Sequence, residues 1–569
     1  MFSPTLDLYK KSSGFLFLLG LLSFSGFLVS AEGKVWVLNY SFCKLGSVDL
    51  FCSFYFDWIS FLFVAAVLWI SSSILLYSEE YMEGGREKNY FLALMVLFVG
   101  SMCVVVFSLN LVSIMLGWDG LGLVSFLLVI YYQNNKGISS SIITGLSNRV
   151  GDGALLILIG VMVQTGVLEI FYLTSLNHPW LDKIFGLFLV LAAATKSAQI
   201  PFSAWLPRAM AAPTPVSALV HSSTLVTAGV YLMIRSHYFL HSCGLGSFIL
   251  LLGMSTMLVA SLNAVYESDL KKVVALSTLS QLGLMMCSLG LGMVYLCFFH
   301  LLTHAAFKAL LFMCSGDLIH SSEEAQDIRF LGPCLLGVPF TSLLFCGCSL
   351  ALCGFPFLSG FYSKDAILEM GYAKEFSFLY LAFMSFSVGL SSAYCGRLGL
   401  FSFVHFHKMP SCFSLCEKQG SMLYSKVLLF IFSVLSGFFM AESVAVFMEV
   451  PVVSSFEKVI SLLSVVLGFA ITCTSEENLK LGFHKTNWFS LYLSDLSFLS
   501  SSTSGISLHV SGVMSEVGLK LEHSASNFFF GASILEGFSA LVYPLLSSQT
   551  FGYFSFSLIF VSISFFTFF

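Results

Sequence analysis

The sequence predicts an all-α polytopic membrane protein with about 15 transmembrane helices. Its 569 residues are 57% hydrophobic and only 10% charged, and the mean hydropathy is +0.90. A soluble protein of this length does not need so much apolar surface. Proline also interrupts two long apolar stretches, at Pro201 and Pro356. A proline break frees backbone carbonyls inside a membrane helix, so the two breaks indicate a duplicated transport unit.

The individual spans follow from the length of each apolar stretch, which must reach about 20 residues. We expect spans at 13–30, 51–77, 90–107, 109–132, 138–165, 184–203, 215–235, 245–266, 270–291, 293–314, 334–356, 376–403, 424–446, 458–474 and 552–569. The first follows Lys10 and Lys11 as in a signal peptide, but the many later spans favour a first transmembrane helix. Lys and Arg are enriched in the loops on the N-terminal side, which predicts that the N-terminus faces the matrix or cytoplasm.

The stretch between the last two spans, 475–551, contains no apolar run of spanning length. Its later part, about Ser511 to Leu546, mixes charged residues with Phe, Ile and Leu. This composition predicts a long amphipathic lateral helix along the membrane surface. A poorly ordered loop is the alternative that the pattern leaves open.

Several chemistries have no sequence signature here. The 15 cysteines include no CxxC pair and no iron–sulfur spacing, and there is no Walker loop or dinucleotide-binding motif. No basic run indicates nucleic-acid binding. We therefore expect no metal, no redox centre and no bound nucleotide on this chain.

Ionisable residues inside the spans are the strongest functional signal. Asp119 lies about 15 Å into the span 109–132, and Lys196 directly precedes the first proline break. A lone carboxylate at that depth must be paired or protonated. A buried lysine and a carboxylate adjust each other's protonation, as a proton relay requires. A purely structural ion pair is the alternative.

Three histidines and a second lysine extend this pattern. His300, His304 and Lys308 are spaced i, i+4, i+8, which places them on one helix face. A metal site is disfavoured because the cationic lysine repels a metal and the Glu of a zincin is missing. A proton-handling stripe fits better. His221 follows Pro215 early in another helix, where packing and relay roles are both open.

Two charged pairs are more ambiguous. Lys364 and Asp365 follow the second break, and they mark either a surface helix end or a counterpart of Lys196. Arg149 and Asp152 are three residues apart, so they suit an i, i+3 ion pair with a structural role as readily as one in transport.

Six short motifs together carry a family resemblance. They are Asn148–Asp152, Lys196–Gln199, Pro213–His221, Ser277–Gly283, His304–Lys308 and Phe361–Asp365. In this order they closely resemble subunit 5 of mitochondrial NADH–ubiquinone oxidoreductase (respiratory complex I), within the antiporter-like subunit family. The strong motifs cover about 110–370, and the interrupted C-terminal region is also similar.

The resemblance implies two inverted five-helix repeats, each with a broken helix, and a lateral helix on the matrix side. It puts Asp119 in the family's acidic position, paired with Lys196, and Lys308 and Lys364 in the central and exit-side positions. His221, His300 and His304 fall on relay positions, and the supporting residues are Arg149, Asp152, Pro201, Pro356 and Asp365. Two departures are Asp119, where many members have Glu, and a count of fifteen spans where the family often has sixteen.

The resemblance also implies domains and function. The expected parts are N-terminal transmembrane helices (1–108), an antiporter-like proton-translocating core (109–400), C-terminal transmembrane helices (401–500), and the lateral helix with a final anchor (501–569). The chain would pump protons in the membrane arm, with NADH, FMN, iron–sulfur clusters and ubiquinone on other subunits. A stand-alone cation/proton antiporter subunit is the main alternative, and a non-conducting scaffold is another.

The resemblance implies partners and a location, namely neighbouring antiporter-like subunits and membrane lipids in the mitochondrial inner membrane. Composition adds one observation on location. Phe (61) and Gly (45) are abundant while Pro (12) and His (12) are scarce. This balance suggests a coding strand rich in T and G, and therefore a mitochondrially encoded chain.

Overall fold

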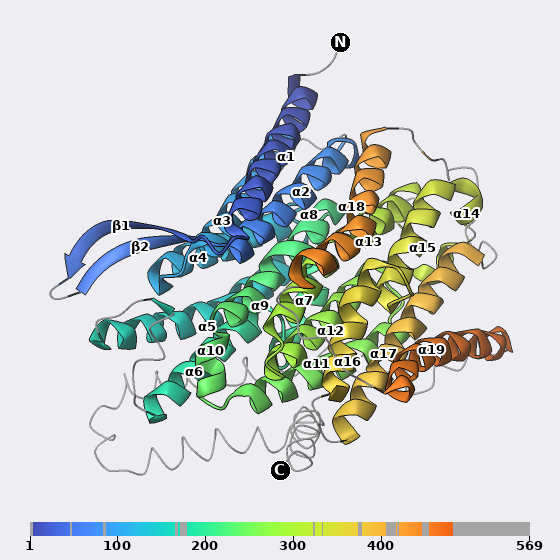
Figure 1. Cartoon of the computed structure of the whole chain (residues 1–569). Helices are drawn as coiled ribbons and strands as arrows, with labels where there is room; N and C mark the ends of the chain where they lie inside the picture. Colours follow the sequence, from blue (N-terminus) through green and yellow to red (C-terminus); the bar gives the residue numbers. More distant parts are fainter. Residues whose placement is uncertain are drawn as a thin grey trace. The chain divides into compact units, whose positions relative to one another are not determined.

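The computed structural model describes residues 4–45, 48–83, 87–165, 169–170, 179–322, 325–332, 334–373, 378–404, 417, 420–445, 454–481 and 512. The chain separates into two compact units, Met1–Asn487 and Trp488–Phe569, and every described helix and strand belongs to the first. Figure 1 shows that these elements are helices apart from one pair of strands. Among the described residues, 11 helices are long and apolar enough to cross a membrane.

The N-terminal part combines helices with a β-hairpin. Its elements are α1 (Pro4–Ser30), β1 (Trp36–Leu45), β2 (Val48–Phe56), α2 (Trp58–Tyr81), α3 (Lys88–Phe107) and α4 (Leu111–Val129). The strands pair antiparallel from Trp36 opposite Phe56 to Leu45 opposite Val48, with one irregularity between Ser41 and Cys43. β2 also packs against α2, α3 and α4.

The hairpin corrects the all-α prediction and the span 51–77. Residues 48–56 are rich in Val, Phe and Tyr, which suit a pleated strand. Asp57 then ends the strand and starts α2, because its side chain accepts a hydrogen bond from the Ser60 amide at 3.0 Å while the Ser60 hydroxyl accepts one from the Asp57 amide. The predicted span therefore merged a strand with the helix that follows it.

The middle of the chain contains the first broken helix. Its elements are α5 (Asn135–Thr165), α6 (Pro179–Lys196), a 3₁₀ turn (Phe202–Ala204), α7 (Trp205–Ala209), α8 (Thr214–Leu219), a π-helical stretch (Val220–Thr224), α9 (Leu225–Arg235) and α10 (His237–Ser242). From Thr214 to Arg235, α8, the π-helical stretch and α9 form one continuous apolar segment, and its side chains are buried.

The second broken helix follows three long helices. The elements are α11 (Gly246–Tyr266), α12 (Leu270–Gly290), α13 (Val294–Ser321), a 3₁₀ turn (Ile328–Phe330), α14 (Cys334–Gly337), α15 (Pro339–Cys353), a π-helical stretch (Phe361–Asp365), α16 (Ala366–Ala373), α17 (Phe378–Gly399), a π-helical stretch (Leu400–Val404), α18 (Ser421–Ala445) and α19 (Ser455–Leu481). Every predicted span before residue 475 overlaps one of the described helices. The last span (552–569) and the lateral helix (Ser511 to Leu546) fall outside the described residues, Gly512 excepted, so the count of fifteen stays a prediction.

Burial separates lipid-facing helices from central ones. Apolar side chains such as Leu116 (67% exposed), Leu343 (66%) and Val466 (63%) lie on the outer faces, as expected beside lipid. The apolar parts of α12 and α13, in contrast, are buried throughout. α11 and α12 pack closely because Gly253 and Gly283 leave room, since a Cβ on either would come within 2.7 Å of the other helix. His300, His304 and Lys308 of α13 are therefore held inside the protein rather than in lipid.

Candidate functional site

The first break lies where the sequence predicts it, because α6 ends at Lys196 and helix resumes only after Pro201. Pro201 cannot donate to the carbonyl of Ser197. That carbonyl instead accepts a hydrogen bond from Gln199 Nε2 at 3.2 Å. Thr256 of α11 in turn donates to Gln199 Oε1 at 2.7 Å. Protein side chains thus satisfy the freed carbonyl and fix the interrupted backbone beside the lysine.

Lys196 is fully buried beside α4. Its Nζ donates to the Trp118 carbonyl at 3.2 Å and lies 5.3 Å from the centroid of the Trp118 ring. Gly122, one turn further along α4, leaves space for the amine, since a Cβ there would lie 3.3 Å from Nζ. Asp152 and Asp119 are its acidic neighbours. The amine is therefore held by a carbonyl and an aromatic face, with two carboxylates nearby.

Asp119 corrects the predicted pairing. Its carboxylate lies 2.8 Å from Arg149 Nη1, whereas Lys196 does not come within ion-pair distance of it. Arg149 also reaches Asp152 at 3.3 Å, as the i, i+3 spacing predicts. The Asp119 side chain is 35% exposed and is paired with the guanidinium of Arg149 on α5, while it remains a charged neighbour of Lys196. Lys196 meets α4 at the backbone of Trp118 instead.

His221 lies in the π-helical stretch between α8 and α9 and is buried. Among the described residues, neither of its ring nitrogens has a hydrogen-bond partner. Its ring centroid is 6.0 Å from that of Trp205, whose Nε1 donates to the Thr195 carbonyl at 3.0 Å. Trp205 therefore connects the broken end of α6 to His221, and the π-helical stretch packs directly on α13.

The predicted stripe on α13 is buried along its length. His300 is held by two hydrogen bonds, one between Nδ1 and Ser363 Oγ at 2.9 Å and one in which Nε2 donates to Gln281 Oε1 at 3.2 Å. Ser363 belongs to the π-helical stretch after the second break, and Gln281 to α12. His300 therefore links α13 to both neighbouring elements.

His304 and Lys308 continue the same face. The ring centroids of His300 and His304 are 6.1 Å apart, and neither ring nitrogen of His304 has a partner among the described residues. Lys308 Nζ donates to Ser277 Oγ at 2.5 Å. Ser277 and Gln281 are one helical turn apart on α12, so that motif supplies partners to both ends of the stripe. Sequence reasoning identified the motif but not these contacts.

The second break differs in how its carbonyls are satisfied. α15 ends before Gly354, whose φ of 86° suits glycine, and Pro356 follows two residues later. Lys364 Nζ donates to the Leu352 carbonyl at 3.3 Å and to Ser391 Oγ on α17 at 2.9 Å. The lysine itself thus caps the interrupted helix, as a residue buried inside the bundle rather than one at a surface helix end.

Asp365 is also buried, and it is a charged neighbour of Lys364. The predicted residues therefore form two groups. Asp119, Arg149, Asp152 and Lys196 surround the first break, and His300, His304, Lys308, Lys364 and Asp365 surround the second. His221 lies on the π-helical stretch that packs on α13, and its ring lies beside Trp205, which donates to the Thr195 carbonyl at the first break.

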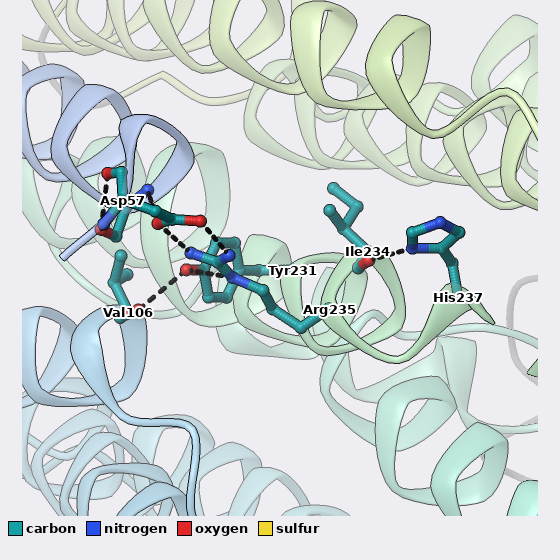
Figure 2. Close-up of polar contacts among 7 residues, drawn as sticks. Asp57, Val106, Tyr231, Ile234, Arg235 and His237 are labelled. Carbon is teal, nitrogen blue, oxygen red and sulfur yellow. Dashed lines mark hydrogen bonds and ion pairs between the residues drawn. The ribbon is translucent and has the colours of Figure 1, made fainter. Parts of the chain in front are cut away.

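One buried ion pair, formed by the last residue of the predicted span 215–235, was not expected from the sequence. Figure 2 shows Arg235 donating to both carboxylate oxygens of Asp57, at 2.6 and 2.8 Å, and to the Tyr231 hydroxyl. Tyr231 donates in turn to the Val106 carbonyl at 2.8 Å. Burial would raise the pKa of Asp57, but the hydrogen bonds and charge of Arg235 outweigh burial and lower it. This network ties the start of α2 to the end of α9.

A second unexpected pair joins Asp317 of α13, which is partly buried, to Lys426 of α18, which is buried. The apolar pattern of these helices gave no sign of it, because the two residues are 109 positions apart in the sequence. Among the described residues, no three His, Cys, Asp or Glu side chains are grouped so as to hold a metal ion. The ionisable groups inside the bundle therefore include ion pairs, hydrogen-bonded lysines and the hydrogen-bonded His300, whereas His221 and His304 have no hydrogen-bond partner among the described residues.

Comparison with known proteins agrees with the motifs. Residues 108–391 match the family described as NADH:quinone oxidoreductase/Mrp antiporter, and 42–92 match the complex I chain 5 N-terminus. NADH-ubiquinone oxidoreductase chain 5 of Aedes aegypti is 48% identical over 437 residues, covering 75% of this chain and 74% of that protein. The chain 5 of Lumbricus terrestris is 42% identical over 433 residues, covering 76% and 75%.

Solved structures share the fold. The Mrp complex from Dietzia sp. superposes with a TM-score of 0.69 at 23% identity, covering 90% of this chain and 63% of that one. The archaeal membrane-bound sulfane sulfur reductase superposes with a TM-score of 0.66 at 19% identity, covering 82% and 96%. The motifs, the broken helices and the identity to animal relatives agree, and the chain belongs to the NADH-ubiquinone oxidoreductase chain 5 family.

Proposed function

We propose that this chain is a proton-translocating membrane-arm subunit of an NADH:ubiquinone oxidoreductase in the mitochondrial inner membrane. The observation that carries the proposal is Lys196, a fully buried amine beside a broken helix with two acidic neighbours. A scaffold could replace such a group with an apolar residue at no cost in stability, whereas a proton relay needs it. The identity to chain 5 proteins favours this role over that of a stand-alone antiporter.

The first step is an electrostatic exchange at α4. Asp119 is paired with Arg149 at 2.8 Å, and Lys196 is held by a neutral carbonyl. If the carboxylate moved from Arg149 toward Lys196, it would favour the charged amine, and its return would favour proton release. Quinone reduction elsewhere in the complex would bias this exchange. Moving one charge against 100 mV costs about 2.3 kcal/mol, which sets the least coupling free energy that each event needs.

The later steps use the groups that follow along the bundle. His221 and His304 are buried, and their ring nitrogens form no hydrogen bond with any described residue. Both can therefore accept a proton from water and pass it on. Lys308 and Lys364, each held by a serine hydroxyl, are the next proton carriers. We place proton release near Lys364 and Asp365, and we assign Pro201 and Pro356 the role of interrupting the helices beside the two lysines.

No redox cofactor is assigned to this chain in the proposal. NADH, FMN, iron–sulfur clusters and ubiquinone would be bound by other subunits, because this sequence has no motif for them. The skew toward Phe and Gly codons supports mitochondrial encoding.

The segment from about Ser511 to Leu546 is proposed to be a lateral helix that contacts neighbouring antiporter-like subunits. Its mixed composition supports this, since its apolar side chains are costly to leave in water. Deleting the segment while keeping residues 552–569 should loosen the attachment of this subunit to the membrane arm. A subunit that remains fully attached during native electrophoresis would contradict the role.

The experiment that tests the proposed function is Lys196→Met in the assembled complex. Electron transfer should be slowed and proton pumping lost, while assembly is retained, because methionine fills a similar volume. Lys183→Met is the matched control, since Lys183 is an exposed lysine on the same helix. A normal ratio of protons to electrons in the Lys196→Met complex would overturn the proposal.

A further inference from the structure

Two cysteines lie beside the second pair of lysines. Cys353 is the last residue of α15, and Cys395 lies on α17. Both are buried, at 1% and 5% exposure, and neither forms a disulfide. Their thiols are within hydrogen-bonding reach of each other. The pair therefore joins the end of the broken helix to α17.

The hydrogen bonds of Lys364 place its amine beside both thiols. One acceptor is the Leu352 carbonyl, adjacent in sequence to Cys353. The other is Ser391 Oγ, one helical turn before Cys395 on the same face of α17. Lys364 is therefore clamped between the two elements that carry the cysteines, and both thiols are its electrostatic neighbours.

Lys308 approaches the same pair from α13. Its strongest ionisable neighbours are Cys395, Cys353, Lys364 and Cys348, and none of these is a carboxylate. This differs from Lys196, whose strongest neighbours include Asp152 and Asp119. Lys308 thus has thiols rather than carboxylates as its acidic neighbours, whereas Lys364 has the Asp365 carboxylate as well as the two thiols.

We propose that the Cys353–Cys395 pair exchanges protons with Lys308 and Lys364 and forms the link between them. This inference rests on the proposed proton-translocating function. In each exchange an ammonium group gives its proton to a thiolate, leaving a neutral amine and a thiol, and the thiol then gives that proton to the other, neutral amine. No electron is transferred and no bond to sulfur other than S–H is broken. The pair can do this because it is in reach of both lysines and can hold either charge state.

The test uses Cys395→Ala and Cys395→Ser in the assembled complex. Alanine removes the exchanging group, and proton pumping should fall about tenfold, less than the loss expected for a principal acid–base group because Cys353 remains. Serine should retain more activity, because a hydroxyl keeps a hydrogen-bonded path. Serine does not ionise in this range, so its pH–activity profile should still differ from that of the parent complex.

Other groups that titrate near the pair are Lys308 on α13, Lys364 after the break, and Tyr394 on α17. Cys297→Ser is the matched control, because Cys297 is buried on α13 and its thiol donates to the Met285 carbonyl, with neither Lys308 nor Lys364 among its neighbours. The control should pump normally with an unchanged pH profile.

Two results would overturn the inference. One is a Cys395→Ala complex that assembles and pumps normally. If alanine prevents assembly, the other is a Cys395→Ser complex whose pH profile matches that of the parent. Either result leaves the proposed function standing if Lys196→Met has lost pumping. Normal pumping in Lys196→Met would instead remove the function on which this inference rests.

Discussion

Both broken helices leave backbone carbonyls without their helical hydrogen bonds, and different side chains donate to these carbonyls at the two breaks. At the first, Gln199 satisfies the freed carbonyl of Ser197, and Lys196 is left to interact with Trp118 and two carboxylates. At the second, Lys364 itself caps the end of α15. Lys196 therefore does not help to satisfy the interrupted backbone, whereas Lys364 does.

Their electrostatic surroundings differ as well. Around Lys196 the ion pair of Arg149 with Asp119 is partly exposed, at 52% and 35%, so it is open to influence from outside the subunit. Lys308 and Lys364 are buried beside hydroxyls and thiols, and Lys364 also neighbours the buried Asp365 carboxylate. This difference suggests that the first break responds to a signal and the second conducts the proton.

Among the variants that compare the two breaks, the largest effect should come from Lys308, because it is fully buried on α13 and is a neighbour of Lys364. Lys308→Met should reduce proton pumping by about 100-fold, the lower end of what a general acid–base group contributes. Pumping in reconstituted vesicles measures this. Lys136→Met, at an exposed lysine, should leave pumping unchanged. Substantial pumping through the Lys308→Met complex would mean that the proton path bypasses α13.

A smaller effect is expected at the signal-responding break. Asp119→Asn should lower pumping about tenfold, since a neighbouring charge changes a protonation equilibrium by that order. Asp119→Glu should retain activity, because it keeps the charge and reaches further. If Asn and Glu gave the same pumping rate, the charge of Asp119 would have no part in the switch and the contrast between the two breaks would fail.

The third prediction concerns the stability that the buried Asp57–Arg235 ion pair contributes. Asp57→Asn leaves Arg235 without its buried counter-charge, so the free energy of unfolding should fall by about 3–5 kcal/mol. The pKa of Asp57 is lowered in the folded state. The stabilisation is therefore present above the unfolded pKa of about 3.9 and lost as the pH falls through the folded pKa.

Thermal unfolding of the purified complex at neutral and acidic pH checks this. Acidification below about pH 4 should destabilise the parent more than Asp57→Asn, because the variant has no carboxylate to protonate. Glu32→Gln is the control, since Glu32 forms only an exposed pair with Lys34. Equal acid sensitivity in the parent and Asp57→Asn would show that the pair does not contribute.

Much of this arrangement was predictable because membranes constrain sequence strongly. Spans follow from apolar length, and the breaks at Pro201 and Pro356 follow from the missing proline donor. The i, i+4, i+8 spacing placed His300, His304 and Lys308 on one face. These features depend only on local periodicity or on one residue's covalent structure.

Contacts between distant segments were not predictable. Asp119 was expected to pair with Lys196, but it pairs with Arg149 instead. The directions of side chains between α4 and α5 depend on how these two helices pack. The Asp57–Arg235 pair joins residues 178 apart in sequence. The hairpin was missed because an apolar strand and an apolar helix end look alike when they are adjacent.

The smallest predicted effect on pumping is at Gln199. It distinguishes satisfying the broken backbone from carrying the proton at the first break. Gln199→Leu keeps the volume but leaves the Ser197 carbonyl without its donor, so stability should fall by about 1–3 kcal/mol. Pumping in the assembled complex should persist, because Lys196 is held by Trp118 instead. Lys364→Met, in contrast, should lower both stability and pumping, since that lysine both caps α15 and carries the proton. Loss of pumping in Gln199→Leu without loss of stability would show that Gln199 acts in proton transfer, and that the two breaks share more chemistry than their contacts indicate.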